Sequence, residues 1–212
     1  MHPVYVHIKK ELSPFYAEEE ASAMAKWISS DILHLFTLEL YTGKDMNFST
    51  KEWAELEDIL RRLKQREPLQ YILQKASFCG RSFHVEQGVL IPRPETEELV
   101  EWIVSDYRKA GQVRILDIGT GSGCIPVSLA QLLPEAQVSS CDVSTEALRI
   151  AAMNVKRYGG KVTLFCADIL KEELPECQVD VLVSNPPYIT ESERTDICLL
   201  YTSPSPRDST SS

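Results

Sequence analysis

An apolar run that ends in three closely spaced glycines constrains this chain more than any other feature. It spans Val113 to Gly123 and reads Val-Arg-Ile-Leu-Asp-Ile-Gly-Thr-Gly-Ser-Gly, and apolar residues at helical spacing follow it. Glycine adopts positive φ readily and has no Cβ, so a ligand can approach its backbone closely. The pattern therefore predicts a strand, a tight glycine turn, and a helix whose first N–H groups face an electron-rich ligand.

The spacing of this turn differs from that of a dinucleotide-binding loop, which is G-x-G-x-x-G with the acidic residue further along. Here Asp117 precedes Gly119, Gly121 and Gly123, giving D-x-G-x-G-x-G. The pattern resembles the first motif of class I S-adenosyl-L-methionine (SAM) methyltransferases. In that family the loop wraps the methionine part of SAM, and the Asp helps to hold its amino end. The alternative interpretation is an ordinary glycine-rich turn between a strand and a helix.

Strand-like and helix-like segments alternate after this turn. Residues 138–141, 162–166 and 179–183 are short apolar runs, and residues 145–157 show a helical pattern. Alternating strands and helices predict an α/β fold with a parallel sheet and right-handed crossovers.

Polar residues follow the strands of this expected sheet: Asp117, Asp142, Asp168 and Asn185. Because open parallel sheets bind ligands at the carboxyl ends of their strands, four such residues around a glycine loop indicate a site. Asp142 is placed to accept hydrogen bonds from ribose hydroxyls. Asp168 is placed to accept from an adenine amino group, with Ile169 against the ring. The alternative for either carboxylate alone is a helix N-cap.

The segment Ser184-Asn-Pro-Pro-Tyr-Ile189 follows the last of these strands. Its consecutive prolines end the strand and fix the backbone. The side-chain carbonyl of Asn185 and the backbone carbonyl of Pro186 can together accept both hydrogens of a planar NH2 group, and Tyr188 can stack on that group. These contacts would aim a weakly nucleophilic amide or aryl amine at a methyl donor, so positioning and electrostatics would carry the reaction. A proline-rich turn with a capping Asn is the alternative.

The N-terminal third lacks any catalytic constellation and reads as helical. Residues 17–40 form one amphipathic stripe, and Ser49 with Glu52 forms a capping box for the next helix. Residues 77–85 suit a short β-hairpin around Cys79-Gly80-Arg81. Arg93 stands between two prolines on a rigid arm, and Glu95 or Thr96 opens a helix that runs to about Ala110.

Composition narrows the classes of function. The 212 residues carry a formal charge of −9 and are 43% hydrophobic, typical of a soluble globular protein. The negative charge argues against a broad nucleic-acid-binding face, and no apolar run approaches the roughly 20 residues that cross a membrane. No signal peptide is visible, and the six cysteines form no C-x-x-C pair. We therefore expect a cytoplasmic protein with free thiols, no metal site and no membrane association.

Four segments together resemble the peptide chain release factor N5-glutamine methyltransferase family. They are Arg66-Glu-Pro68, Leu90-Ile-Pro-Arg-Pro-Glu-Thr-Glu97, Asp117 to Gly123, and Asn185 to Tyr188. The family methylates the glutamine of the Gly-Gly-Gln loop of class I release factors. The resemblance implies a helical substrate-docking domain (1–70), a β-hairpin linker (71–94) and a Rossmann-like class I methyltransferase domain (95–194), with strand order 3-2-1-4-5.

The resemblance also implies roles for individual residues. SAM would contact Asp117, Gly119, Thr120, Gly121, Ser122, Gly123, Asp142, Asp168, Ile169 and Asn185. The glutamine amide would lie against Asn185, Pro186, Pro187 and Tyr188, with Asn185, Pro186 and Tyr188 as the catalytic group and Arg93 as a further substrate contact.

The chain departs from the family after about Arg194. Residues 195–212 are dominated by Ser, Thr and Pro, a composition typical of a disordered tail, and they do not resemble the family's continuation. We therefore expect an incomplete methyltransferase domain whose fourth strand is an open edge, with reduced stability and activity.

Two other functions are compatible with the motifs. One is methylation of an exocyclic amine in nucleic acid, at N6 of adenine or N2 of guanine, because N-P-P-Y also serves such targets. The other is a non-catalytic chain that docks a release factor through residues 1–66. SAM binding without turnover would indicate the latter.

Overall fold

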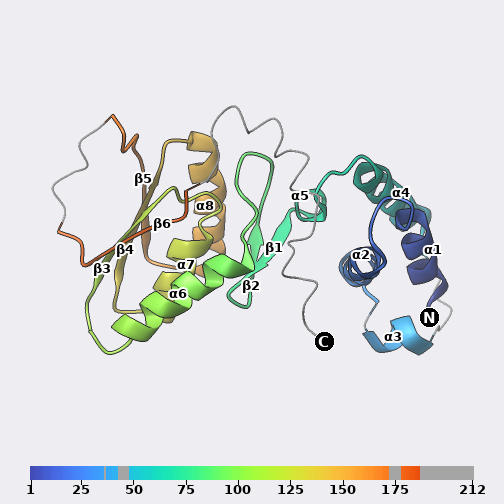
Figure 1. Ribbon diagram of the computed structural model, residues 1–212, viewed down its shortest axis with the longest axis horizontal. Helices are drawn as coiled ribbons and strands as arrows, with labels where there is room; N and C mark the ends of the chain where they lie inside the picture. The colour runs from blue at the N-terminus through green and yellow to red at the C-terminus, as the bar shows by residue number, and fades with distance from the viewer. Residues whose placement is uncertain (36, 43–47, 172–177, 187–212) are drawn as a thin grey trace. The chain divides into compact units, whose positions relative to one another are not determined.

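The computed structural model describes residues 1–35, 37–42, 48–171 and 178–186 (Figure 1). The described residues form two compact units, 1–72 and 73–186. Residues 195–212, expected to be a disordered tail, lie outside the described part, as do Pro187 and Tyr188.

The first unit is helical, as predicted from its periodicity. Its helix α1 (Pro3–Leu12) packs against α2 (Glu18–Asp31) and α4 (Thr50–Lys64). The buried side chains Ile8, Ile28 and Leu56 come from these three helices. The hydroxyl of Tyr16 donates a 2.6 Å hydrogen bond to the carbonyl of Leu63, which joins the loop after α1 to α4. Helix α3 (Thr37–Thr42) also lies in this unit, and α5 (Leu69–Leu73) lies at its end and reaches the first residue of the second unit.

The expected single helix over residues 17–40 is wrong, because two helices, α2 and α3, occupy this span. The interruption includes His34, whose φ of 52° is left-handed and incompatible with a continuous α-helix. Leu33 and Leu35 are nevertheless buried. The apolar stripe therefore continues through a non-helical turn, which periodicity alone does not distinguish from helix.

The capping box at the start of α4 is confirmed. The backbone N–H of Glu52 donates to the Ser49 hydroxyl over 3.2 Å, and the Glu52 carboxylate accepts from the backbone N–H of Ser49 over 2.7 Å. Two N–H groups of the first turn are thus satisfied by side chains.

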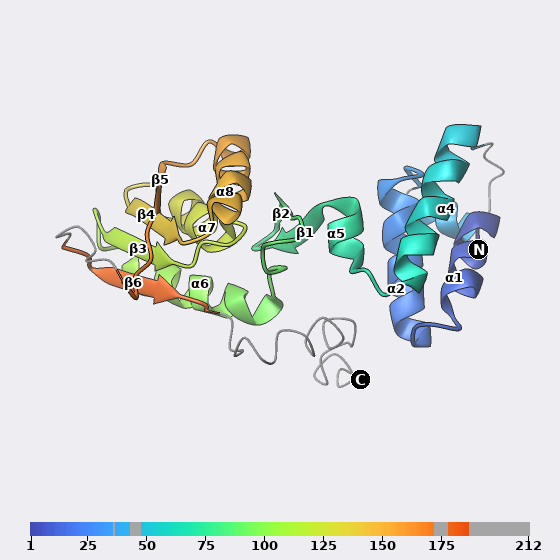
Figure 2. The same cartoon turned by 90° about the horizontal axis from the view of Figure 1, so that it is seen from above.

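The second unit contains the predicted hairpin, followed by strands and helices that form an α/β fold (Figures 1 and 2). Helix α6 starts at Pro94, one or two residues before the expected start, and ends three residues before Ala110. The elements are β1 (Lys75–Phe78), β2 (Arg81–His84), α6 (Pro94–Tyr107), β3 (Arg114–Ile118), α7 (Cys124–Leu132), β4 (Gln137–Asp142), α8 (Thr145–Tyr158), β5 (Val162–Cys166) and β6 (Val181–Ser184).

The four strands of the main sheet lie in the order β5-β4-β3-β6 and all pair in parallel. This is the predicted order, with the first strand of the domain in the middle and the fourth beside it. Helices α6, α7 and α8 lie beside one face of the sheet in both views (Figures 1 and 2). All four carboxyl ends therefore meet at one edge, where ligands bind in open parallel sheets.

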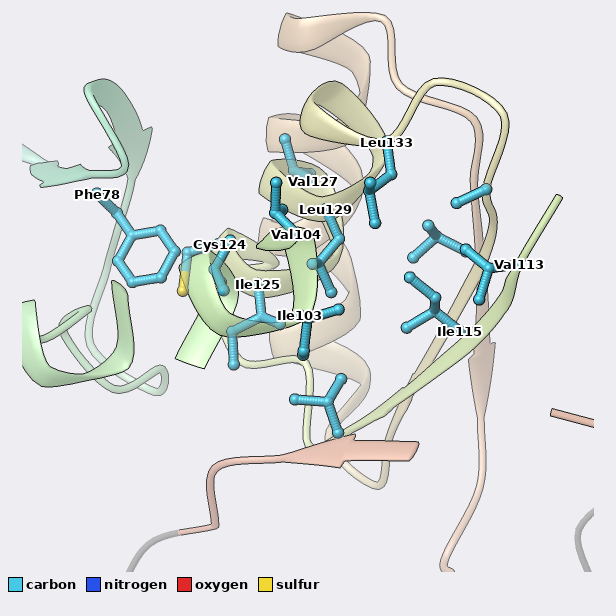
Figure 3. Packing of buried hydrophobic residues seen from close by; sticks show 14 of the residues in the cluster. Phe78, Ile103, Val104, Val113, Ile115, Cys124, Ile125, Val127, Leu129 and Leu133 are labelled. Carbon is cyan, nitrogen blue, oxygen red and sulfur yellow. The ribbon is translucent and has the colours of Figure 1, made fainter. Parts of the chain in front are cut away.

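The core of this unit lies between the sheet and its helices (Figure 3). Ile115 of β3 faces Ile103 of α6 and Ile125 of α7 across this layer. The hairpin contributes Phe78 and Phe83, which meet edge-on with ring centroids 6.1 Å apart. The hairpin is thus part of the same core as the sheet.

Candidate active site

The glycine loop turns back over the end of the neighbouring strand. The backbone N–H groups of Gly119 and Thr120 both donate to the carbonyl of Cys141 in β4, over 2.9 and 3.0 Å. Gly119, Gly121 and Gly123 have φ values of 82°, 50° and 78°. Because side chains strain a backbone at positive φ, this path requires glycine. The loop delivers the chain directly into α7, which has Gly123 as its N-cap.

The glycines differ in what surrounds them. A Cβ added at Gly119 or Gly121 would meet no atom within 4 Å, whereas one at Gly123 would lie 3.1 Å from the Cα and Cβ of Ala151 in α8. Gly123 therefore allows the loop to pack against α8. Gly119 and Gly121 border open space, where a ligand can approach their backbone.

Asp142, the last residue of β4, links the loop to the start of α8 through hydrogen bonds. One carboxylate oxygen accepts from the backbone N–H of Gly121 over 3.0 Å, and the other accepts from that of Ser144, the N-cap of α8, over 2.9 Å. A carboxylate oxygen has lone pairs for more than one donor. Asp142 can thus hold the loop and still accept from a ligand hydroxyl.

Asp117 lies inside β3 and is fully buried. Its Oδ2 accepts a 2.6 Å hydrogen bond from the hydroxyl of Ser140 on β4. Burial, with the nearby charge of Asp142, raises the pKa of Asp117 to about 7, although the Ser140 hydrogen bond opposes the rise. A carboxylate in this position would gain strongly from a cationic group beside it.

Three buried polar atoms around the loop have no well-formed hydrogen bond to the described residues: Asp117 Oδ1, Thr120 Oγ1 and Ser122 Oγ. Such atoms are rare in folded proteins because each loses its bonds to water. Together with the open space at Gly119 and Gly121, they fit a ligand that carries polar and cationic groups.

A single side chain, Asn154 of α8, connects the loop to the hairpin. Its amide nitrogen donates to the carbonyl of Ser122 over 2.8 Å and to that of His84 over 2.9 Å. Its carbonyl oxygen accepts from the backbone N–H of His84 over 2.8 Å. Asn154 was not among the site residues predicted from the sequence, although it is a polar residue on the apolar side of the expected helix.

Asn185 follows β6 at the same sheet edge. Its amide nitrogen donates a 2.9 Å hydrogen bond to the hydroxyl of Thr96 in the first turn of α6. Pro186 is exposed. Arg93, which precedes α6 as its N-cap, is also exposed, and its backbone carbonyl accepts from the N–H of Thr96 over 3.0 Å.

Asp168 and Ile169 follow β5 as expected. The carboxylate of Asp168 forms a 2.9 Å ion pair with Lys171 and accepts from the backbone N–H of Leu170 over 3.1 Å. The hydrogen bond from Lys171 is the main cause that lowers the pKa of Asp168. Ile169 is 41% exposed, so its side chain offers apolar surface at this edge.

Both units of the chain match known protein families. The PrmC N-terminal domain family matches residues 5–73, and the Methyltransferase small domain family matches residues 96–200. A release factor glutamine methyltransferase from Bacteroides thetaiotaomicron is 44% identical, over 93% of this chain and 70% of its own length. The chain belongs to the release factor glutamine methyltransferase family.

Other relatives carry the same name. The relative from Flavobacterium psychrophilum is 39% identical over 88% of this chain and 66% of its own length. The relative from Bacillus subtilis is also 39% identical, over 77% of this chain and 56% of its own length. The chain thus spans 56 to 70% of the length of these three relatives.

The solved structures that resemble this chain include other methyltransferases. A tRNA (uracil-54, C5)-methyltransferase from Pyrococcus abyssi has 18% identity and a TM-score of 0.44, over 53% of this chain and 28% of its own. A putative RNA methyltransferase from Pyrococcus horikoshii has 21% identity and a TM-score of 0.41, over 55% of each chain.

Within this release factor glutamine methyltransferase family member, the glycine loop, Asp142, Asp168 and Asn185 all lie at the carboxyl edge of one parallel sheet. Asp117 differs from the expectation of a strand-end residue, because it lies within β3 and faces Ser140. None of the described helices is long and apolar enough to cross a membrane.

Proposed function

We propose that this chain binds SAM and methylates the side-chain amide nitrogen of the glutamine in the Gly-Gly-Gln loop of class I release factors, in the cytoplasm. Family membership supports the proposal, and the observation that carries it is the orientation of Asn185. Because the amide nitrogen of Asn185 bonds to Thr96, its carbonyl oxygen is the end that can accept a hydrogen from a substrate amide.

The glycine loop would hold the cofactor. When bound, SAM supplies an electrophilic methyl group. We assign the cofactor's amino end to Asp117, the polar groups of its amino-acid part to the loop Gly119–Gly123, and its ribose to Asp142. Asp168 and Ile169 would hold the adenine. The buried polar atoms at Asp117, Thr120 and Ser122, which lack a well-formed hydrogen bond, support the first two assignments.

Asn185 and Pro186 would position the substrate. Two carbonyl acceptors that bind both hydrogens of a carboxamide nitrogen keep that nitrogen in one place and raise its electron density. We include Pro187, Tyr188 and Arg93 in the substrate site on sequence grounds, with the amide stacked on Tyr188. The helical unit would dock the release factor.

The direct test is methyl transfer to a purified class I release factor, followed by mass spectrometry of the peptide that contains the Gly-Gly-Gln loop. We expect a gain of one methyl group on the glutamine, absent from a release factor in which that glutamine is alanine. Asn185→Ala should lower the rate by roughly 100-fold, as loss of a single positioned polar group does in other enzymes. Methylation of RNA or DNA without methylation of release factor would overturn the proposal.

A binding measurement separates cofactor recognition from catalysis. Calorimetric titration of SAM should show binding to the wild-type chain, moderately weaker binding to Asn185→Ala, because we also assign Asn185 a contact with SAM, and much weaker binding to an Asp142→Ala variant. Equal affinity of the wild type and Asp142→Ala would contradict the cofactor assignment. Binding without methyl transfer to any release factor would indicate a non-catalytic chain.

A further inference from the structure

The hydrogen bond between Asn185 and Thr96 joins residues far apart in the chain, one after β6 and one in the first turn of α6. Thr96 is 8% exposed, so its hydroxyl lies mostly out of water. From the sequence, Thr96 was predicted only as a possible helix start and had no predicted function.

We propose that Thr96 is a positioning residue that holds the carboxamide of Asn185 in the orientation required for substrate binding. This inference rests on the proposed function, because it concerns how Asn185 presents its oxygen to the glutamine amide. A carboxamide has a donor end and an acceptor end of nearly equal size. In the structure the Thr96 hydroxyl accepts from the donor end of Asn185, which leaves the acceptor end for substrate.

The position of Thr96 makes it a rigid support. It lies in a helical first turn, where its own N–H donates to the carbonyl of Arg93 over 3.0 Å, and β-branching restricts its χ1. Further along α6, Ile103 and Val104 pack beside Ile125 of α7, the helix that follows the glycine loop (Figure 3). The same core therefore fixes both the cofactor loop and the support of Asn185.

The alternative role for Thr96 is purely structural, as a small buried residue that fills space under α6. The two roles differ in what each substitution changes. Thr96→Val preserves shape and removes the hydroxyl, whereas Thr96→Ser preserves the hydroxyl and removes a methyl group. A positioning role predicts loss only in the first variant, and a packing role predicts equal loss in both or greater loss in the second.

The first readout is independent of catalysis. NMR spectra of the 15N-labelled full chain contain signals from the side-chain amide protons of Asn185, which report the hydrogen bond directly. These signals are assigned from their absence in Asn185→Ala. We expect Thr96→Val to shift these signals and speed their exchange with water, and Thr96→Ser to leave both near wild type. Unaltered Asn185 signals in Thr96→Val would overturn the proposal.

The second readout is kinetic. For Thr96→Val we expect kcat for release factor methylation to fall about 10- to 100-fold, because a small misplacement of a positioning group costs rate. The SAM dissociation constant should stay within about twofold of wild type, and Thr96→Ser should recover most of the rate. Thr163→Val is the matched control, since Thr163 is exposed on β5, and it should change neither readout.

The two readouts also separate failure of this inference from failure of the proposed function. If the wild-type chain methylates no release factor, the proposed function fails and the amide signals still decide whether Thr96 orients Asn185. If the wild type is active and Thr96→Val has wild-type kcat, the positioning role is excluded. Equal losses in Thr96→Val and Thr96→Ser, with altered thermal unfolding in both, would show a packing role instead.

Discussion

The amide nitrogen of Asn154 donates a hydrogen bond to the carbonyl oxygen of Ser122, which ties the middle of α8 to the glycine loop over 2.8 Å. The same side chain pairs with the backbone N–H and carbonyl of His84 at the end of β2. Asn154 is fully buried, so water cannot replace these partners. One side chain thus joins the hairpin, the loop and α8.

We predict that Asn154→Ala lowers the free energy of unfolding by about 3 kcal/mol, because three backbone groups lose their buried partner at once. Urea denaturation followed by circular dichroism measures the effect, and SAM affinity should fall in parallel because the loop loses its anchor. Met153→Ala is the matched control, since Met153 is 42% exposed on the same helix, and it should cost less than about 0.5 kcal/mol. Equal stability of the two variants would refute the anchoring role.

The glycine loop and the parallel sheet were predictable because each follows from local pattern, whereas the strand order was implied by the family resemblance. D-x-G-x-G-x-G marks a turn that needs positive φ, and short apolar runs separated by helical patterns indicate parallel strands. The positions of Asp142 and Asn185 at the sheet edge were predictable for the same reason, because each immediately follows an apolar run. Their hydrogen-bond partners within the protein could not be predicted, because a hydrogen bond to Gly121 or Thr96 depends on how the elements pack.

Thr96 and Asn154 were not among the site residues predicted from the sequence. Each occupies a core position of an amphipathic helix: Thr96 lies on the same stripe as Val100 and Ile103, and Asn154 on that of Ile150 and Ala151. A polar residue at such a position must find a partner inside the protein. A polar residue within the apolar stripe of a helix could therefore have indicated both positions from the sequence. Only the structure identifies the partner of each side chain.

The glycines of the loop should respond differently to the same substitution. Gly123→Ala would place a Cβ 3.1 Å from two atoms of Ala151 at a φ of 78°, so we expect a loss of about 2 to 3 kcal/mol in stability from crowding and strain. Gly121→Ala meets open space and carries only the cost of positive φ, about 1 kcal/mol. Its Cβ would enter the space proposed for the cofactor, so SAM affinity should still fall at least tenfold.

Gly111→Ala provides the control for this pair. Gly111 has a φ of 73° and a Cβ there would meet nothing within 4 Å, but it lies before β3 and outside the loop. Its stability should match that of Gly121→Ala while SAM affinity stays at the wild-type value. Thermal unfolding and calorimetric titration of the three variants measure both quantities. Weakened SAM binding in Gly111→Ala would contradict the assignment of the cofactor to the loop.

Asp142→Asn tests whether the carboxylate holds the loop. Its two oxygens accept from Gly121 and Ser144, and an asparagine would turn an NH2 donor toward one of these N–H groups. We expect stability to fall by about 1 to 2 kcal/mol and SAM affinity to fall at least tenfold. Glu135→Gln, the same chemical change at an exposed residue, should alter neither. Wild-type affinity in Asp142→Asn would exclude the role proposed for this carboxylate.

Asp117 should make stability depend on pH in a direction opposite to that of an ordinary ion-paired carboxylate. Burial raises its pKa from 3.8 to about 7 in the folded chain. Between these values the folded state binds a proton that the unfolded state has released, so the contribution of Asp117 to stability falls as pH rises from about 4 to about 7 and is constant above. Its full size is on the order of 4 kcal/mol.

The variant Asp117→Asn cannot ionise and removes this dependence. The wild type should therefore lose stability relative to the variant as pH rises from 5 to 8. At pH 8 the variant should be the more stable chain. SAM affinity should fall in the variant, because the proposed cationic partner of Asp117 loses its carboxylate. In the wild type at pH 7, SAM binding should release protons, since a nearby cation favours the ionised carboxylate, and calorimetry in two buffers of different ionisation enthalpy detects that release. A stability difference that does not change with pH, together with binding that releases no protons, would show that Asp117 is already ionised in the folded chain.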